Sequence, residues 1–491
     1  MNIMRKAGIL LHPTSLPSKE GIGTLGNEAY RFIDFLSKSK QKLWQIFPLG
    51  PTGYGDSPYQ CFSAFAGNPY LIDLETLVNE GYLDASVLEV NFGDNKESID
   101  YGMIYTNKLP LLKNAFSRFN VENNDFVQFN NDNDYWLDNY SLFAALKTHF
   151  NGEAWSNWPS ELKNREVEAL NEYKNKLVDE INYQKFLQFM FFKQWNSVKA
   201  YANQKGVEII GDIPIFVSMD SADAWSNPEI FLFDKDRNPV KVAGVPPDYF
   251  SATGQLWGNP LFDWAKLKET GYKWWIDRVK ANLSLYDIIR IDHFRGFESY
   301  WAINYGETTA INGKWEKGPG IDLFKAIKDA LGEINIIAED LGILTDEVVE
   351  LKESAGFPGM KILQFAFDQD PENEYLPHNY ETNTVVYTGT HDNDTTNSWY
   401  FKLSDEEKGE VRDYLNVSDD SYIVYSMIRL ALRSVADTAI IPMQDYLNLG
   451  EFARINTPGL ASGNWQWRLS GWELNDDLAV TIAHLTEIYG R

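Results

Sequence analysis

The chain has 491 residues, of which 44% are hydrophobic and 23% are charged, so a large folded core is expected and a disordered chain is not. Its formal net charge of -26 argues against a basic surface for nucleic acid or anionic lipid. The single cysteine, Cys61, rules out an intrachain disulfide and a cysteine metal cluster.

The N-terminus leads into a strand-like run without the long apolar segment of a signal peptide, and no later stretch is long enough to span a membrane. Together with the cysteine usage, this predicts a cytoplasmic protein without membrane or nucleic-acid partners. Aromatic residues make up 14% of the chain, which suits contacts with sugar faces but is also typical of a large core.

Strand-like apolar runs alternate with helical periodicity along most of the chain. The predicted strands cover residues 7–12, 43–49, 207–214, 288–291, 334–339, 360–367, 384–390 and 438–443. An open doubly wound sheet is the alternative, but its GxGxxG turn does not follow Leu11. The alternation therefore predicts an α/β fold, a (β/α)8 TIM barrel with large helical and loop insertions.

Two segments interrupt this alternation. Residues 74–180 are acidic, helical in pattern and rich in Asn and Trp, which predicts a helical insertion. Residues 216–268 contain a long stretch, 245–260, that mixes aromatics with glycines and amides and has no internal period. This composition favours a substrate clamp over a passive connection. We therefore predict one catalytic barrel over residues 1–491 that carries both insertions.

The strand at 288–291 combines apolar residues with charge. Alternation along a strand places Arg290 and Asp292 on one face and Ile289 and Ile291 on the other. A carboxylate at the C-terminal end of a barrel strand is a typical catalytic group, and a neighbouring arginine would keep it ionised. A purely structural ion pair is the alternative. Asp287 is predicted to be a charge at the solvent side of the strand entry.

Four acids follow predicted strands: Asp212, Asp292, Glu339 and Asp392. Acids that converge on one barrel mouth suit glycosyl chemistry, in which an oxocarbenium-like transition state needs one carboxylate and one protonated carboxyl. Asp340, next to Glu339, is expected to point away from the mouth.

Two other classes compete with this interpretation. His12, His293 and His391 also lie near strand ends, as in metal-dependent hydrolases. Barrel metallohydrolases commonly place two histidines one residue apart on the first strand, whereas here Pro13 and Thr14 follow His12, so hydrogen bonding to a neutral ligand is favoured and no metal is predicted. A non-catalytic sugar-binding protein would explain the aromatics but not acids that repel one another.

Several ordered motifs carry a resemblance to a known family. Residues 290–296 (RIDHFRG), 337–342 (IAEDLG) and 387–394 (YTGTHDND) resemble the signature segments of the amylomaltases. These are the 4-α-glucanotransferases of glycoside hydrolase family 77, related to the α-amylase barrels. The resemblance also covers residues 12–17, 57–59, 246–260, 456–459 and 464–468, hence nearly the whole chain.

The resemblance implies a retaining transferase in which Asp292 is the nucleophile, Glu339 the general acid/base and Asp392 the transition-state stabiliser. It implies maltooligosaccharides and α-1,4-glucans as donor and acceptor, and no cofactor. An α-glucan hydrolase of the amylase type is the alternative. The residues expected to contact substrate are Arg290, His293, His391, Asp212, Tyr59, Gln255, Trp257, Tyr54 and Asn464.

The implied roles agree with elementary electrostatics. The carboxyls of a retaining pair lie about 5 to 5.5 Å apart. The negative charge of Asp292 should therefore raise the pKa of Glu339 and keep that carboxyl protonated for the first step.

Overall fold

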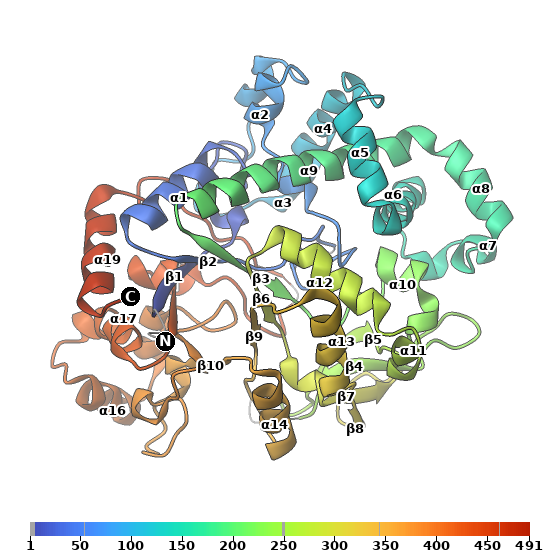
Figure 1. The fold of residues 1–491 in the computed structure, drawn as a ribbon. Helices are drawn as coiled ribbons and strands as arrows, with labels where there is room; N and C mark the ends of the chain where they lie inside the picture. Colours follow the sequence, from blue (N-terminus) through green and yellow to red (C-terminus); the bar gives the residue numbers. More distant parts are fainter. Residues whose placement is uncertain (1–4, 54, 248–250, 343, 461) are drawn as a thin grey trace.

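A parallel barrel forms the centre of the molecule in the computed structural model, which describes residues 5–53, 55–247, 251–342, 344–460 and 462–491 (Figure 1). Its strands are β1 (Lys6–Leu10), β2 (Leu43–Gln45), β3 (Glu208–Ile213), β6 (Ile288–Ile291), β9 (Ile336–Ala338), β10 (Gly359–Ile362), β11 (Thr384–Tyr387) and β12 (Thr438–Pro442). They pair in the order β10-β11-β12-β1-β2-β3-β6-β9. The amide of Ala338 donates to the carbonyl of Pro358 at 2.9 Å across the remaining gap, so the predicted barrel is confirmed.

Three strands end at least three residues earlier than the sequence predicts. β2 ends at Gln45, and β10 ends at Ile362 because a 3-10 turn follows. β11 ends at Tyr387, so Asp392 lies in the loop beyond the strand rather than at its end. The apolar runs from which these strands are predicted continue beyond the last residue that pairs with a neighbouring strand.

Helices surround the barrel, and those nearest the chain ends pack on each other. The main ones are α1 (Asn27–Lys38), α12 (Lys273–Leu285), α13 (Ile321–Leu331), α14 (Asp346–Ala355), α16 (Asp405–Leu415), α17 (Ile423–Arg433) and α19 (Asp476–Ile488). Phe32, Ile33 and Leu36 lie on one face of α1 and are fully buried, which is the periodicity that predicts this helix. α19 contacts both α1 and α17.

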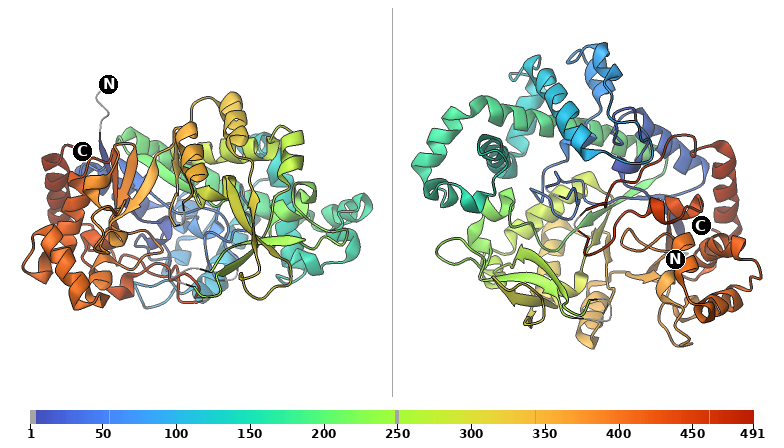
Figure 2. Two further views of the ribbon diagram at one scale, coloured as in Figure 1. Left: turned by 90° about the horizontal axis from the view of Figure 1, so that it is seen from below. Right: turned by 180° about the vertical axis from the view of Figure 1, so that it is seen from behind.

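The segment 74–180 is helical, as predicted. It contains α2 (Leu74–Asn79), α3 (Tyr101–Met103), α4 (Leu109–Ser117), α5 (Asn124–Asp132), α6 (Asp134–His149), α7 (Ser160–Lys163) and α8 (Val167–Lys176). Figures 1 and 2 show α4 to α8 on the side of the molecule away from α16, α17 and α19. α9 (Val178–Gln204) contacts α4, α5, α6 and α8 and also β3, so it joins this group to the barrel.

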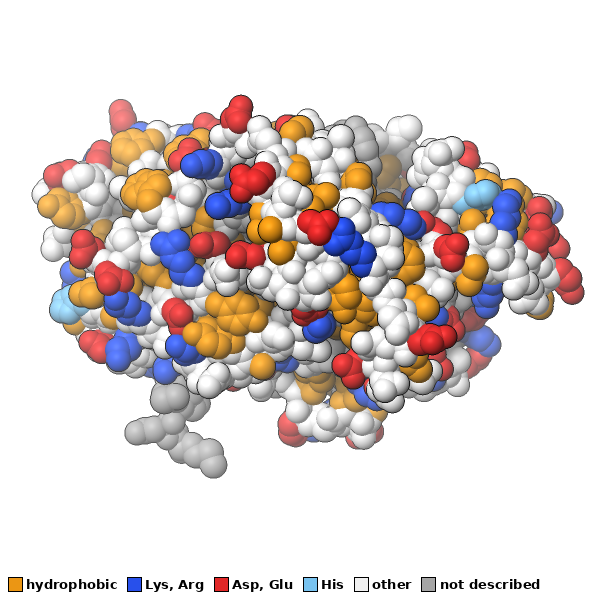
Figure 3. All heavy atoms as spheres, turned by 90° about the horizontal axis from the view of Figure 1, so that it is seen from above, with side chains coloured by type: hydrophobic (Ala, Val, Ile, Leu, Met, Phe, Trp, Pro, Cys, Tyr) orange, Lys and Arg blue, Asp and Glu red, His pale blue; other side chains and the backbone are white. Residues whose placement is uncertain are grey.

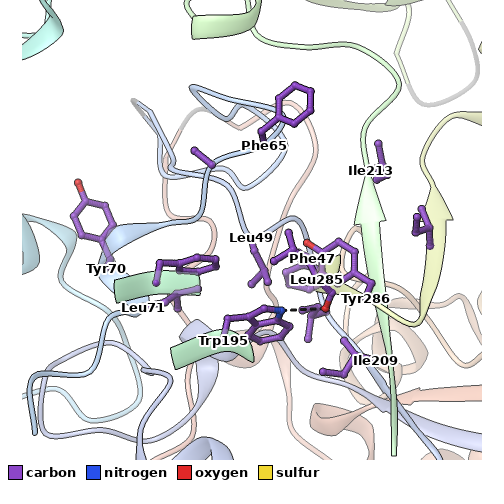
Figure 4. Close-up of a cluster of buried hydrophobic side chains, with 14 of the residues drawn as sticks. Phe47, Leu49, Phe65, Tyr70, Leu71, Trp195, Ile209, Ile213, Leu285 and Tyr286 are labelled. Atoms are coloured by element: carbon purple, nitrogen blue, oxygen red, sulfur yellow. Dashed lines mark hydrogen bonds between the residues drawn. The ribbon is translucent and has the colours of Figure 1, made fainter. Parts of the chain in front are cut away.

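The contact between α9 and the barrel is a cluster of buried hydrophobic side chains (Figure 4). The indole of Trp195 is buried beside Leu49 and donates a hydrogen bond to the carbonyl of Leu285 at 3.0 Å. The ring of Tyr286 lies against Gly211 of β3, where a Cβ atom would be 2.1 Å from the ring. Only glycine fits at this position.

A second, antiparallel sheet lies beside the barrel. Its order is β5 (Gln255–Pro260), β4 (Lys241–Val245), β7 (Ser299–Asn304) and β8 (Lys314–Lys317). Residues 245–260 have no internal period in the sequence, yet residues 255–260 form β5. Gly258 and Pro260 are turn-like residues that an edge strand tolerates, so local pattern did not show the pairing.

The surface agrees with the composition. Figure 3 shows a face on which acidic and basic side chains are interspersed, and its described residues form no continuous basic surface. Among the helices of the described residues, none is long and apolar enough to cross a membrane.

Candidate active site

A cleft of about 430 Å³ lies at the C-terminal ends of the barrel strands. Seven of the residues predicted to act on substrate line it: Tyr59, Gln255, Trp257, Asp292, His391, Asp392 and Asn464. Tyr54, also predicted, lies outside the described residues. A larger cavity of about 750 Å³ at the opposite ends of the strands contains none of the predicted residues. The cleft is therefore the candidate active site.

A buried arginine organises the floor of the cleft. Arg290 on β6 is the register partner of Asp212 on β3, so the two side chains meet across neighbouring strands. The Arg290 guanidinium lies 2.6 Å from Asp212 and 3.0 Å from Asp292. Burial alone would lower its pKa, but the two carboxylates outweigh burial and raise the pKa of Arg290. Arg290 stays charged and holds both acids.

The two acids beside Arg290 differ in exposure. The side chain of Asp212 is 1% exposed, and its Oδ2 atom accepts a hydrogen bond from the Tyr59 hydroxyl at 2.9 Å. Burial raises the pKa of Asp212 to about 7 against the opposing effect of Arg290. The side chain of Asp292 is 31% exposed and lines the cleft. Of the two, Asp292 is the carboxylate that a ligand in the cleft reaches.

Glu339 directly follows β9, the strand that pairs with β6. The backbone amides of His293 and Leu341 donate to its two carboxyl oxygens at 2.7 and 3.2 Å. Burial and the negative charge of Asp292 raise the pKa of Glu339 to about 8. A pKa near 8 keeps the Glu339 carboxyl protonated at neutral pH.

Asp392 lies in the loop after β11 and its side chain is 50% exposed. Its Oδ1 atom accepts a hydrogen bond from the side-chain amide of Asn456 at 2.6 Å and lies 3.4 Å from Nε2 of His391. The His391 ring stacks on Tyr59 with 4.9 Å between ring centroids. Asp392 and Asp292 are the two carboxylates that line the cleft among the described residues, whereas Glu339 lies behind the lining.

Of the three histidines considered as metal ligands, His12 and His391 are buried and His293 is partly buried, and all three have lowered pKa values. Burial lowers the pKa of His12 to about 3 and that of His293 to about 4, and it also lowers the pKa of His391. Nδ1 of His12 accepts a hydrogen bond from the amide of Phe47 at 3.1 Å. Within the described ranges, no group of three or more His, Cys, Asp or Glu residues is placed to hold a metal ion.

The β5 residues and Asn464 form part of the cleft wall. The Trp257 indole donates to Gln255 at 3.1 Å, and its ring meets His293 edge-on with 4.9 Å between centroids. Asn464 accepts from the amide of Thr457 at 2.9 Å and donates to the carbonyl of Leu460 at 2.9 Å. These contacts fix the Asn464 side chain to the loop that carries it.

The two acids set aside in the sequence have structural partners. Asp340 is buried, pairs with Lys352 at 2.7 Å and accepts from the amide of Met360, so it points away from the cleft as expected. Asp287 accepts from the amide of Ile209 at 2.8 Å, at the start of β3. It therefore joins two strand entries instead of only facing solvent.

No role for Asn456 or Arg454 is predicted from the sequence. Asn456 lies in the motif at residues 456–459, and Arg454 lies outside it. Arg454 donates to the backbone carbonyl of Asp392 at 2.9 Å. The two residues lie in a loop without periodicity, 62 and 64 positions beyond Asp392. No spacing rule connects such residues, so only the folded chain shows the contact.

A family model described as 4-alpha-glucanotransferase matches residues 11–475. The chain belongs to this family. It is 54% identical over 485 residues to a 4-alpha-glucanotransferase of Clostridium butyricum, covering 98% of this chain and 100% of the relative. It is 47% identical over 503 residues to the 4-alpha-glucanotransferase of Thermus thermophilus, covering 100% of both.

A solved structure agrees with these relatives. Amylomaltase from Streptococcus agalactiae in complex with acarbose matches with a TM-score of 0.97 and 42% identity over 99% of each chain. The family, the barrel and the 4-α-glucanotransferase activity that the sequence predicts are confirmed.

Proposed function

We propose that Asp292, Glu339 and Asp392 carry out 4-α-glucanotransfer by a retaining double displacement. Glu339 donates its proton to an α-1,4 glycosidic oxygen while Asp292 attacks the anomeric carbon. The glycosidic bond breaks, the remainder of the donor leaves with the proton, and a β-linked glucosyl–enzyme ester forms.

The second step reverses the first with a new partner. Glu339, now ionised, takes the proton from the 4-hydroxyl of an acceptor glucan. That oxygen attacks the anomeric carbon, the ester to Asp292 breaks, and an α-linkage forms again. Two inversions give net retention, and the steps use no metal and no organic cofactor. Asp392 stabilises the positive charge that develops on the sugar ring.

The observation that carries this proposal is the unequal pair formed by Asp292 and Glu339. The Arg290 guanidinium lies 3.0 Å from Asp292 and holds this partly exposed carboxylate at the cleft. Burial and that same charge raise the pKa of Glu339 to about 8, which favours its protonated form at neutral pH. A nucleophile and an acid are thus ready before substrate binds.

The proposed substrates are maltooligosaccharides and longer α-1,4-glucans, as donor and as acceptor. The structural relative from S. agalactiae was solved with acarbose. Tyr59, Trp257 and His391 offer ring faces and hydrogen-bonding groups in the cleft, and Gln255 and Asn464 add amides. Because Asp212 is buried beneath Tyr59 and Arg290, we assign it to hold those two groups rather than the sugar.

We also propose that residues 1–491 act as one catalytic unit in which 74–180 and 216–268 are insertions. A continuous hydrophobic core joins barrel residues with residues of both segments, which supports this arrangement. The cytoplasmic location and the lack of nucleic-acid and membrane partners stay predictions from composition.

Incubation with maltotriose alone tests the proposed reaction. Transfer yields glucose and a ladder of longer glucans without a gain in reducing ends, because each broken linkage is replaced by another. An α-glucan hydrolase would raise the number of reducing ends as products form. A parallel reaction with a chelator tests the metal-dependent alternative, which predicts loss of activity.

A further inference from the structure

The loop that carries Asp392 lacks the support that the barrel gives the other two acids. Asp292 and Glu339 directly follow β6 and β9, whereas Asp392 stands five residues past the end of β11. With half of its side chain exposed, Asp392 has room for more than one rotamer. A catalytic carboxylate in this position needs partners that fix it.

One partner acts on the carboxylate. The Asn456 side-chain amide donates to Oδ1 of Asp392 at 2.6 Å, which leaves Oδ2 for another partner. Nε2 of His391 lies 3.4 Å from the same Oδ1 atom. Hydrogen bonds to an ionised carboxylate are short and directional. The contact therefore selects which oxygen atom faces the cleft.

The other partner acts on the backbone. Arg454 donates to the carbonyl of Asp392 at 2.9 Å and, through Nε, to the carbonyl of Asn456 at 2.9 Å. Its guanidinium also lies 3.9 Å from Oδ2 of Asp394. Asp394 is in turn held by Ser398 at 2.8 Å and Lys402 at 2.6 Å. Arg454 thus fastens the loop of Asn456 to the loop of Asp392.

We infer that Asn456 and Arg454 are positioning residues for Asp392. Asn456 sets the orientation of the carboxylate, and Arg454 sets the distance between the two loops. The inference rests on the proposed role of Asp392 in stabilising the transition state. Because misplacement of a catalytic group by 1 Å costs about 10²-fold in rate, loss of the Asn456 amide should lower kcat by about that factor. KM should change much less, since interactions made mainly in the transition state affect kcat.

A double-mutant cycle separates positioning from other roles of Asn456. Asn456→Ala, Asp392→Ala and the double variant are assayed for glucose release from maltotriose. A urea unfolding curve is also measured for each variant, to show that the variant is folded before denaturant is added. If Asn456 acts through Asp392, Asn456→Ala lowers kcat in the wild-type chain but has no further effect once Asp392 is alanine. Asn397→Ala is a matched control, because Asn397 is, like Asn456, a partly buried asparagine, but its amide donates to Asn448 instead.

The outcomes distinguish this inference from the proposed function. Equal losses from Asn456→Ala in both backgrounds, or unchanged kcat in the wild-type background, overturn the positioning role. A near-normal rate for Asp392→Ala overturns the role assigned to Asp392 itself. Arg454→Lys keeps the charge but not the planar fork, so it should restore only part of the kcat lost in Arg454→Ala. If Arg454→Lys had the kcat of the wild-type chain, the claim that Arg454 acts through its planar guanidinium would be contradicted.

Discussion

The activity should fall at alkaline pH because Glu339 loses its proton there. The first chemical step needs Glu339 protonated, and burial together with the charge of Asp292 raises the pKa of Glu339 from its ordinary 4.5 to about 8. Raising the pH through 8 therefore removes the proton that the leaving oxygen needs. Above that pKa, each pH unit should lower kcat/KM about tenfold, so the loss at pH 10 is about 100-fold.

The assay measures initial rates of glucose release at low maltotriose concentration from pH 5 to 10. Samples held at high pH and returned to pH 7 should recover full activity, which excludes irreversible inactivation as the cause. Burial also raises the pKa of Asp212 to about 7, so Asp212→Asn is the control. The limit should stay near pH 8 in this variant. A profile that is flat to pH 10, or a limit that disappears with Asp212, would refute the assignment to Glu339.

Further changes have expected outcomes. Asp292→Asn should lower turnover of maltotriose by several orders of magnitude, and near-normal turnover would contradict its role as nucleophile. Arg290→Met removes the cationic partner that Asp212 and Asp292 share and should cost about 3–5 kcal/mol in urea unfolding. Glu339→Gln should stabilise the protein at pH 9 more than at pH 4, because ionisation of a group with a raised pKa costs stability as pH rises from 4.5 to 8. Gly211→Ala should lower Tm, since its Cβ atom meets the Tyr286 ring.

The barrel and the positions of Asp292 and Glu339 at its mouth could be predicted because both depend on local pattern. Apolar runs alternating with helical periodicity specify the β/α units, and a carboxylate after such a run lies at the barrel mouth. Asp292 and Glu339 follow their strands closely, as this rule requires. Their roles came from the resemblance of the surrounding motifs.

Contacts between distant segments could not be predicted from local pattern. The pairing of Asp212 with Arg290 depends on the register of β3 against β6, which neither strand specifies alone. The strand at 255–260 forms only because β4 pairs with it, although its glycine and proline are typical of turns. The support of Asp392 by Arg454 comes from a loop 62 residues away.

Trapping the covalent intermediate tests the central claim most directly. A maltosyl fluoride donor fluorinated on the reacting ring slows both steps, and fluoride leaves without a proton, so the ester should accumulate. Peptide mass spectrometry after acid quenching should then find the glycosyl mass on the peptide that contains Asp292. The label should be absent in Asp292→Asn. A label on Glu339 or Asp392, or fluoride release without any labelled peptide, would contradict the double displacement at Asp292.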